Sequence, residues 1–102
     1  MFRVFRSNWY DEKFRELTKS DQERVDKFEQ HLKQQPYSGK PLGYKFFREK
    51  KFNENRLIFL VYEDFNAVFL ATITNKKMQQ TVIDLIKRNL DKYKENIRSL
   101  VG

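Results

Sequence analysis

The stretch "YKFFREKKFNENRLIFLVYE", residues 44–63, begins with aromatic and cationic side chains and ends in an almost unbroken apolar run. The polar triplet "NEN" at residues 53–55 divides it into two segments of strand length, 44–52 and 56–62. Segment 67–74 follows the polar "EDFN" and is again rich in β-branched and aromatic residues. Strand-forming segments separated by short polar turns predict an antiparallel meander of three strands.

The N-terminal part of the chain shows helical periodicity after a short candidate strand at residues 2–6. Ser7 is a candidate cap for a first helix, and Ser20 begins "SDQE", which has the spacing of a capping box for a second helix. We expect the second helix to end before Pro36, because proline disfavours helical backbone at the residue that precedes it. The breaker-rich "QPYSGKPLG" at residues 35–43 is interpreted as a crossing loop.

The C-terminal segment, residues 77–100, is expected to form one long amphipathic helix, because its apolar side chains recur every three or four positions. The order of elements is then β, α, α, β, β, β, α, which predicts a single α+β domain over residues 1–102. In this arrangement the helices cover one face of a small sheet and leave the other face free.

Composition excludes several classes of site and partner. The chain has no Cys and a single His, His31, so the ligands of a thiolate or histidine metal site are missing, and we expect no metal and no other cofactor. No apolar run approaches the ~20 residues of a membrane span. The N-terminal segment also lacks the continuous apolar region of a signal peptide. These features predict a cytoplasmic protein with no membrane partner.

The formal net charge of +7 is concentrated in two segments. Residues 44–56 carry five basic and two acidic side chains, and residues 75–102 carry seven basic and three acidic ones. If the fold brings these segments together, they form one positive surface, as in proteins that bind polyanions. Cations at a sheet edge also protect that edge from aggregation, so the charge pattern alone leaves both interpretations open.

The cations of the meander suggest a phosphate site. In a hairpin closed at residues 53–55, Arg56 lies beside residues 50–52, so like charges gather in space as well as in sequence. Such a cluster is unfavourable unless an anion lies within it. Neither side of the first meander strand is purely apolar, so we also expect a bulge near residues 49–51.

Cleavage of RNA without a metal is compatible with these residues. The RNA 2′-hydroxyl can attack the adjacent phosphorus, and the protein then has to orient the backbone, stabilise the dianionic transition state and move two protons. Arginine offers a fixed charge with bidentate geometry, and lysine a movable charge that can transfer protons when neighbouring cations depress its pKa. The paired carboxylates or histidine cluster of a two-metal nuclease are missing from the sequence.

The order of elements, together with "GKPLGYKFFREKKFNENRLIFLVYEDFNAVFLATITNKK" at residues 39–77, resembles the RelE/ParE superfamily of toxins from toxin–antitoxin modules, on its RelE branch. The specific features are a "PL" loop, a basic strand, the Arg that opens "RLIFLVY", and a basic pair after the last strand. The resemblance covers most of the chain. It implies a twisted antiparallel sheet with two N-terminal helices, and a concave basic face that enters the ribosomal A site to cut mRNA.

The resemblance also implies which side chains contact the RNA. The essential cations of RelE members match Arg48 and either Lys50 or Lys51 on the first meander strand, Arg56 on the next, and most nearly Lys77 after the last. The expected catalytic group is therefore Arg48, Lys50, Lys51, Arg56 and Lys77. Further RNA contacts are expected from Tyr44, Lys45, Lys76 and Thr81, and Tyr44 is a candidate for stacking or proton transfer.

One position departs from the RelE pattern. Relatives carry a Tyr, and several a His, near the beginning of the last helix, where this chain has Ile83. The polar neighbours of Ile83, two glutamines and Thr81, are not competent general bases at neutral pH. Either Lys50, Lys51 or Tyr44 transfers the proton, or cleavage is slow or absent. The alternative function is a non-nuclease binder, either a ParE-like gyrase inhibitor or a decayed toxin that binds only its antitoxin.

A protein partner is expected beside mRNA in the ribosomal A site. Antitoxins of such toxins commonly wrap them with an acidic amphipathic segment that folds as it binds. Charge and resemblance therefore both predict a cognate acidic antitoxin protein. The apolar stripe of residues 77–100 either completes the core or is partly exposed for such a partner.

Overall fold

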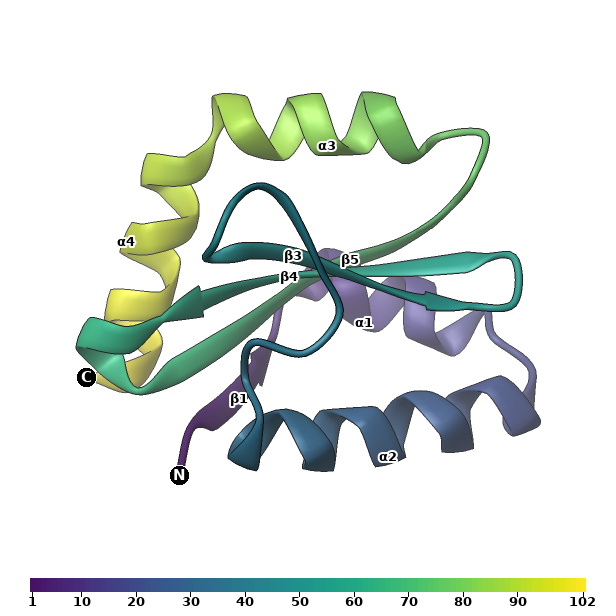
Figure 1. The fold of residues 1–102 in the computed structure, drawn as a ribbon, viewed down its shortest axis with the longest axis horizontal. Coiled ribbons are helices and arrows are strands. Elements are labelled where there is room, and N and C mark those ends of the chain that lie inside the picture. Colours follow the sequence, from purple (N-terminus) through teal and green to yellow (C-terminus); the bar gives the residue numbers. More distant parts are fainter.

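The computed structural model describes residues 1–102, and a five-stranded mixed sheet forms its middle layer (Figure 1). The strands are β1 (Arg3–Arg6), β2 (Lys40–Tyr44), β3 (Phe47–Phe52), β4 (Asn55–Tyr62) and β5 (Ala67–Asn75). The helices are α1 (Asn8–Arg15), α2 (Lys19–Gln34), α3 (Gln79–Arg88) and α4 (Leu90–Val101), and the short 3-10 helix η1 (Glu63–Phe65) joins β4 to β5. The expected α+β class is confirmed. None of the helices combines the length and apolar character that a membrane span requires.

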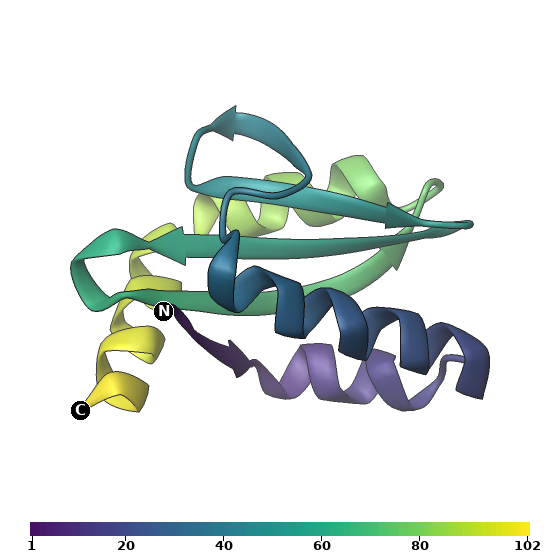
Figure 2. The same ribbon diagram turned by 60° about the horizontal axis from the view of Figure 1, so that its bottom comes forward.

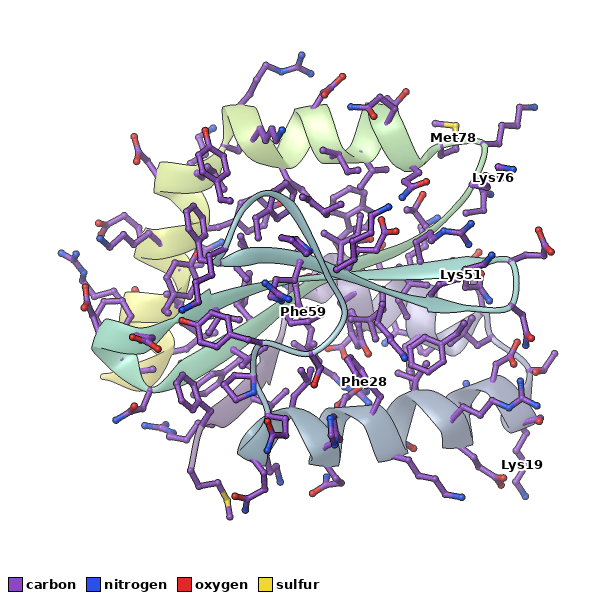
Figure 3. All side chains as sticks on the ribbon, in the orientation of Figure 1. Lys19, Phe28, Lys51, Phe59, Lys76 and Met78 are labelled. Atoms are coloured by element: carbon purple, nitrogen blue, oxygen red, sulfur yellow. The ribbon has the colours of Figure 1, made fainter.

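Helices cover both faces of the sheet, so the expectation of one free face is wrong (Figure 1). Helices α1 and α2 pack on one face, where Phe28 of α2 points at Phe59 of β4 with ring centres 5.9 Å apart (Figure 3). Helices α3 and α4 pack on the other face, where Ile83 and Ile97 join the core. The cause is that β4 and β5 are buried along nearly their whole length. Strands with apolar side chains on both sides need cover on both sides.

The sheet is mixed because β1 pairs with β5 in parallel, which corrects the expected antiparallel sheet. The meander of β3, β4 and β5 is antiparallel, as expected. Strand β2 was not expected from the sequence. It begins at Lys40, inside the segment interpreted as a crossing loop, and it pairs with β3. The sheet order β1-β5-β4-β3-β2 places β1 and β2 at opposite edges (Figure 2).

The bulge expected near residues 49–51 does not form. Strand β3 pairs with β4 without interruption, from Phe47 opposite Leu60 to Phe52 opposite Asn55. The irregularities lie instead between Ile58 and Phe59, where β4 pairs with β5, and within β2. Because both faces of the sheet are covered, β3 can keep a regular ladder without a clean alternation of apolar and polar side chains.

The two N-terminal helices are capped by hydroxyl side chains. Ser7 caps α1 as expected, with its Oγ accepting a hydrogen bond from the Tyr10 backbone N–H at 2.9 Å. Helix α2 is capped by Thr18, whose Oγ1 accepts from the Asp21 N–H at 3.2 Å, and not by Ser20. The helix therefore begins earlier than a capping box at Ser20 requires.

The expected long C-terminal helix is broken into α3 and α4 at Asn89. The Asn89 side-chain amide donates to the Leu85 carbonyl at 2.8 Å. Such a local side-chain bond competes with the helical ladder. The chain changes direction at this point (Figure 1), so that α4 packs over the end of the sheet and fully buries Ile97.

A polar network holds the N-terminal elements together. Arg6 of β1 donates from Nε and Nη2 to the two carboxylate oxygens of Glu29 on α2, at 3.1 and 2.8 Å. The Tyr10 hydroxyl of α1 donates to the same carboxylate at 2.7 Å, and Tyr10 is fully buried. The network therefore links β1, α1 and α2 through one carboxylate.

The network predicts a pH-dependent stability. Burial raises the pKa of Tyr10, and the Glu29 carboxylate adds to this effect. The protonated hydroxyl therefore stabilises the folded state below a pH of about 10, and this contribution is lost as the pH rises above that value. In Tyr10→Phe, the free energy of unfolding should fall less steeply above pH ~10, by about 1.4 kcal/mol per pH unit. Urea denaturation at several alkaline pH values measures the slope, and equal slopes would contradict the assignment.

The turn before β2 predicts a steric requirement for glycine. Gly39 has a φ of +79°, and a Cβ atom there would overlap the Glu49 carbonyl oxygen of β3. Gly102 has nearly the same φ, +80°, but a Cβ atom there would meet no other atom within 4 Å. Gly39→Ala should lower the free energy of unfolding by ~2 kcal/mol or more, and Gly102→Ala should have a much smaller effect. Urea denaturation of both variants separates the destabilisation caused by the steric overlap from that caused by the positive φ.

Candidate nucleic-acid interface

A basic cavity lies where β2 begins, β3 ends and α3 begins. It has a volume of about 400 Å³ and is lined by Gly39, Lys40, Glu49, Lys50, Lys51, Arg56 and Gln79. Four of these side chains are cationic, one is anionic and none is apolar. A concave site with this excess of positive charge favours an anionic ligand.

Glu49 is a carboxylate inside this basic cavity. Its Oε1 lies 4.0 Å from Arg56 Nε, and the Gln79 side-chain amide of α3 donates a hydrogen bond to the same carboxylate. Glu49 faces Ile58 across the ladder and Arg56 faces Lys51, so Glu49 and Arg56 are diagonal neighbours on the face toward α3. Both are buried, with exposed fractions of 5% and 7%. The carboxylate offsets part of the positive charge and orients the guanidinium.

Lys51 and Arg56 come together as the sequence predicted. They are opposite each other in the β3–β4 ladder, and Lys51 is exposed. Arg56 Nη1 also lies 3.4 Å from both the Asn53 and the Asn55 carbonyl oxygens of the hairpin turn. Arg56 is therefore held in place by several contacts, whereas Lys51 is exposed.

Lys50 lines the same cavity, but its ammonium group extends toward the face of the sheet that α2 covers. Its ammonium nitrogen lies 5.7 Å from the centre of the Phe28 ring of α2. Lys40, at the start of β2, contributes an exposed cation instead. No cluster of three or more potential metal-ligating side chains is found in the structure.

Arg48 is separated from this group. It is 8% exposed and donates hydrogen bonds to the carbonyl oxygens of Ser38, Gly39 and Lys45, at 3.1, 3.1 and 2.9 Å. Three backbone acceptors engage its guanidinium from both ends of β2. The contacts of Arg48 therefore hold the β2 segment against β3.

Of the polar residues around the start of α3, only Gln79 lines the basic cavity. Lys76 and Lys77 are exposed in the turn that joins β5 to α3, and Thr81 is exposed on the first turn of α3. Lys76 and Lys51 lie at the same end of the molecule (Figure 3). Ile83, in contrast, is 6% exposed and packs into the core under α3.

Tyr44 and Lys45, at the other end of β2, point in different directions. Tyr44 stacks on Phe46 and is 47% exposed. The Lys45 ammonium lies 4.6 Å from the centre of the Tyr37 ring, at the edge of a second cavity of about 540 Å³. That cavity also contains three carboxylates, from Glu63, Asp64 and Asp91, and is lined by none of the residues of the basic cavity. The structure therefore does not bring Lys45 together with Lys51 and Arg56.

Reasoning from the sequence misses Lys40, Glu49 and Gln79 as members of the site. The sequence pattern places Lys40 in a loop, and it brings Gln79 into consideration only as a general base. Strand alternation alone puts Glu49 on the same side as Lys51, and a diagonal contact with Arg56 follows from the register of the hairpin. The contact between Glu49 and Arg56 could therefore have been predicted from the sequence, because the "NEN" turn fixes the pairing of the two strands to within one residue.

The sequence matches no protein-family model, and no curated protein matches it significantly. Solved structures do match the fold. One is a mutant of Escherichia coli toxin RelE in the free state, 16% identical, with 85% of this chain and 96% of that chain covered and a TM-score of 0.72.

RelE chains in complexes match as well. The intact E. coli RelBE toxin-antitoxin complex contains a chain 16% identical, with 74% of this chain and 96% of that chain covered and a TM-score of 0.66. The archaeal RelE-RelB complex from Pyrococcus horikoshii gives 16% identity, 74% and 94% coverage and a TM-score of 0.65. At this identity the likeness concerns the fold alone. It confirms a RelE-like α+β fold, whereas the antiparallel sheet that the resemblance implied is a mixed sheet. The chain therefore has the fold of the RelE toxins.

Proposed function

We propose that this chain is the toxin of a toxin–antitoxin module and cleaves mRNA in the ribosomal A site without a metal. The observation that carries the proposal is the basic cavity, whose lining carries four cationic side chains and the single carboxylate of Glu49. The RelE fold of the chain supports the same proposal. A ribosome-dependent activity would place the protein in the cytoplasm.

In this proposal Arg56 holds the scissile phosphate. Its guanidinium is already oriented by Glu49 and by the turn carbonyls, so little reorganisation is needed when charge develops on the phosphate oxygens. Lys51 and Lys40 are exposed, and they add positive charge around the same phosphate. Lys76 and Lys77 contact the RNA backbone outside the cavity, on the path by which the strand enters.

The two proton transfers are assigned to Glu49 and Lys51. The 2′-hydroxyl oxygen forms a bond to phosphorus and gives its proton to the Glu49 carboxylate, while the bond from phosphorus to the 5′-oxygen breaks. The leaving 5′-oxygen takes a proton from the Lys51 ammonium. The products are a 2′,3′-cyclic phosphate and a 5′-hydroxyl end. Glu49 thus replaces the base that relatives carry where this chain has the buried Ile83.

An acidic antitoxin is the partner that this surface fits. The RelE chains of the E. coli and P. horikoshii structures are solved with antitoxin or RelB chains. For this chain, carboxylates of an antitoxin segment would occupy the basic cavity in place of RNA phosphates. The net charge of +7 favours such an association at low ionic strength.

A non-nuclease binder is the second candidate, either a ParE-like gyrase inhibitor or a decayed toxin that binds only its antitoxin. Two observations favour it. Ile83 is buried and apolar, and Arg48 is buried and donates to three backbone carbonyls. Under this alternative the basic cavity binds only acidic protein segments.

Removal of the exposed cation tests the phosphate site. In Lys51→Ala, cleavage of mRNA in a cell-free translation reaction should fall about 100-fold, because a cation that stabilises the transition state is lost. Lys27→Ala removes an exposed lysine from α2 and should cleave like the wild type. Primer extension on the mRNA measures the cuts. Equal cleavage by Lys51→Ala and Lys27→Ala would contradict the site, and no cleavage by the wild type would favour the binder.

Substitution of the carboxylate separates chemistry from binding. Glu49→Gln keeps an acceptor for Gln79 but removes the negative charge and the base. Single-turnover cleavage should fall at least 100-fold, whereas binding of a non-cleavable RNA should stay the same or tighten, because the net positive charge of the cavity rises. Cleavage at the wild-type rate would exclude Glu49 as the base. Circular dichroism controls for the fold, since the partner Arg56 is buried.

A further inference from the structure

A row of side chains extends from the basic cavity along β2. Lys40 faces Glu49 across the β2–β3 ladder and Tyr44 faces Phe47. Glu49 contacts α3, and Phe47 belongs to the core beneath α3 and α4, so both ends of β2 present these side chains on the α3 face. Lys40 lines the cavity, and Tyr44 marks the other end of the strand.

Helix α3 runs beside this row. At its first residue, Gln79 contacts Glu49 in the cavity. Further along the helix, the Lys87 ammonium lies 5.9 Å from the centre of the Tyr44 ring and 3.2 Å from the position of a Cβ atom on Gly43. The rise of ~1.5 Å per helical residue separates Gln79 from Lys87 by about 12 Å. The helix therefore spans the distance between the cavity and Tyr44.

Tyr44 forms a half-exposed aromatic platform that is backed by the partly buried Phe46. Their ring centres are 5.1 Å apart, and the ring planes are inclined by 22°. Tyr44 is 47% exposed. A half-exposed ring with a lysine beside it offers what a nucleotide needs, a surface for stacking its base and a cation for its phosphate.

We infer that single-stranded RNA leaves the basic cavity along β2 and α3, with one base stacked on Tyr44 and the adjoining phosphate at Lys87. This inference rests on the proposed function of the cavity. At ~3.4 Å per stacked nucleotide, the path of about 12 Å holds about three nucleotides between the phosphate in the cavity and the base on Tyr44. The platform then binds a base at a fixed distance from the cleaved bond and lengthens the RNA segment that the protein recognises.

The test is binding of labelled, non-cleavable 2′-fluoro RNA, measured by fluorescence anisotropy. Tyr44→Ala should weaken binding of an oligonucleotide of about eight residues by roughly tenfold, because base stacking on an aromatic ring is lost. Tyr44→Phe should bind like the wild type, since stacking needs the ring and not the hydroxyl. Lys87→Ala should also weaken binding. Leu100→Ala, which removes another exposed apolar side chain at the end of α4, is the matched control and should have no effect.

Oligonucleotide length tests the spacing. A dinucleotide reaches the cavity but not the platform, so Tyr44→Ala should bind it as tightly as the wild type does. Equal loss for the dinucleotide and the longer RNA would overturn the path, and so would a similar loss in Tyr44→Phe. If Lys51→Ala weakens binding while Tyr44→Ala does not, the inference is wrong and the proposed phosphate site stands. If neither substitution weakens binding, the proposed function fails as well.

Discussion

The burial of β4 and β5 on both faces is the constraint on which the rest of the structure depends. Their side chains are apolar on both sides, so one layer of helices cannot keep them from water. Helices α1 and α2 supply one layer, and the break at Asn89 lets α3 and α4 supply the other. The centre of the sheet is thereby closed to any large ligand. The basic cavity lies at the margin of the sheet, where β2 begins, β3 ends and α3 begins.

The cations of β2, β3 and β4 make two kinds of contact. Arg48 and Arg56 are buried and held by carbonyls or by Glu49, whereas Lys40 and Lys51 are exposed. The arginines define a fixed frame because their planar guanidinium groups meet several acceptors at once. The lysines give the cavity a charge that can adapt to a ligand. The carboxylate of Glu49 keeps the cluster from being purely repulsive when no anion is bound.

Much of the fold could be predicted from the sequence, and the failures have physical causes. The meander and the first helix follow from local patterns, as do Ser7 as a cap and the pairing of Lys51 with Arg56. The parallel direction of β1 and the double cover of the sheet depend on contacts between distant segments, which periodicity does not encode. For the candidate site, residues of one hairpin could be grouped correctly. Arg48 could not be placed, because its acceptors are backbone carbonyls, and these have no signature in the sequence.

The parallel pairing of β1 with β5 has a consequence for synthesis of the protein. Arg3 lies opposite Ala67, and the Ser7 hydroxyl donates to the Ala71 carbonyl at a separation of 64 residues. Strand β1 has no other neighbour in the sheet. Contacts of such long range form slowly, because a large loop has to close first. While the chain emerges from the ribosome, β1 therefore cannot join the sheet until most of the sequence has been translated.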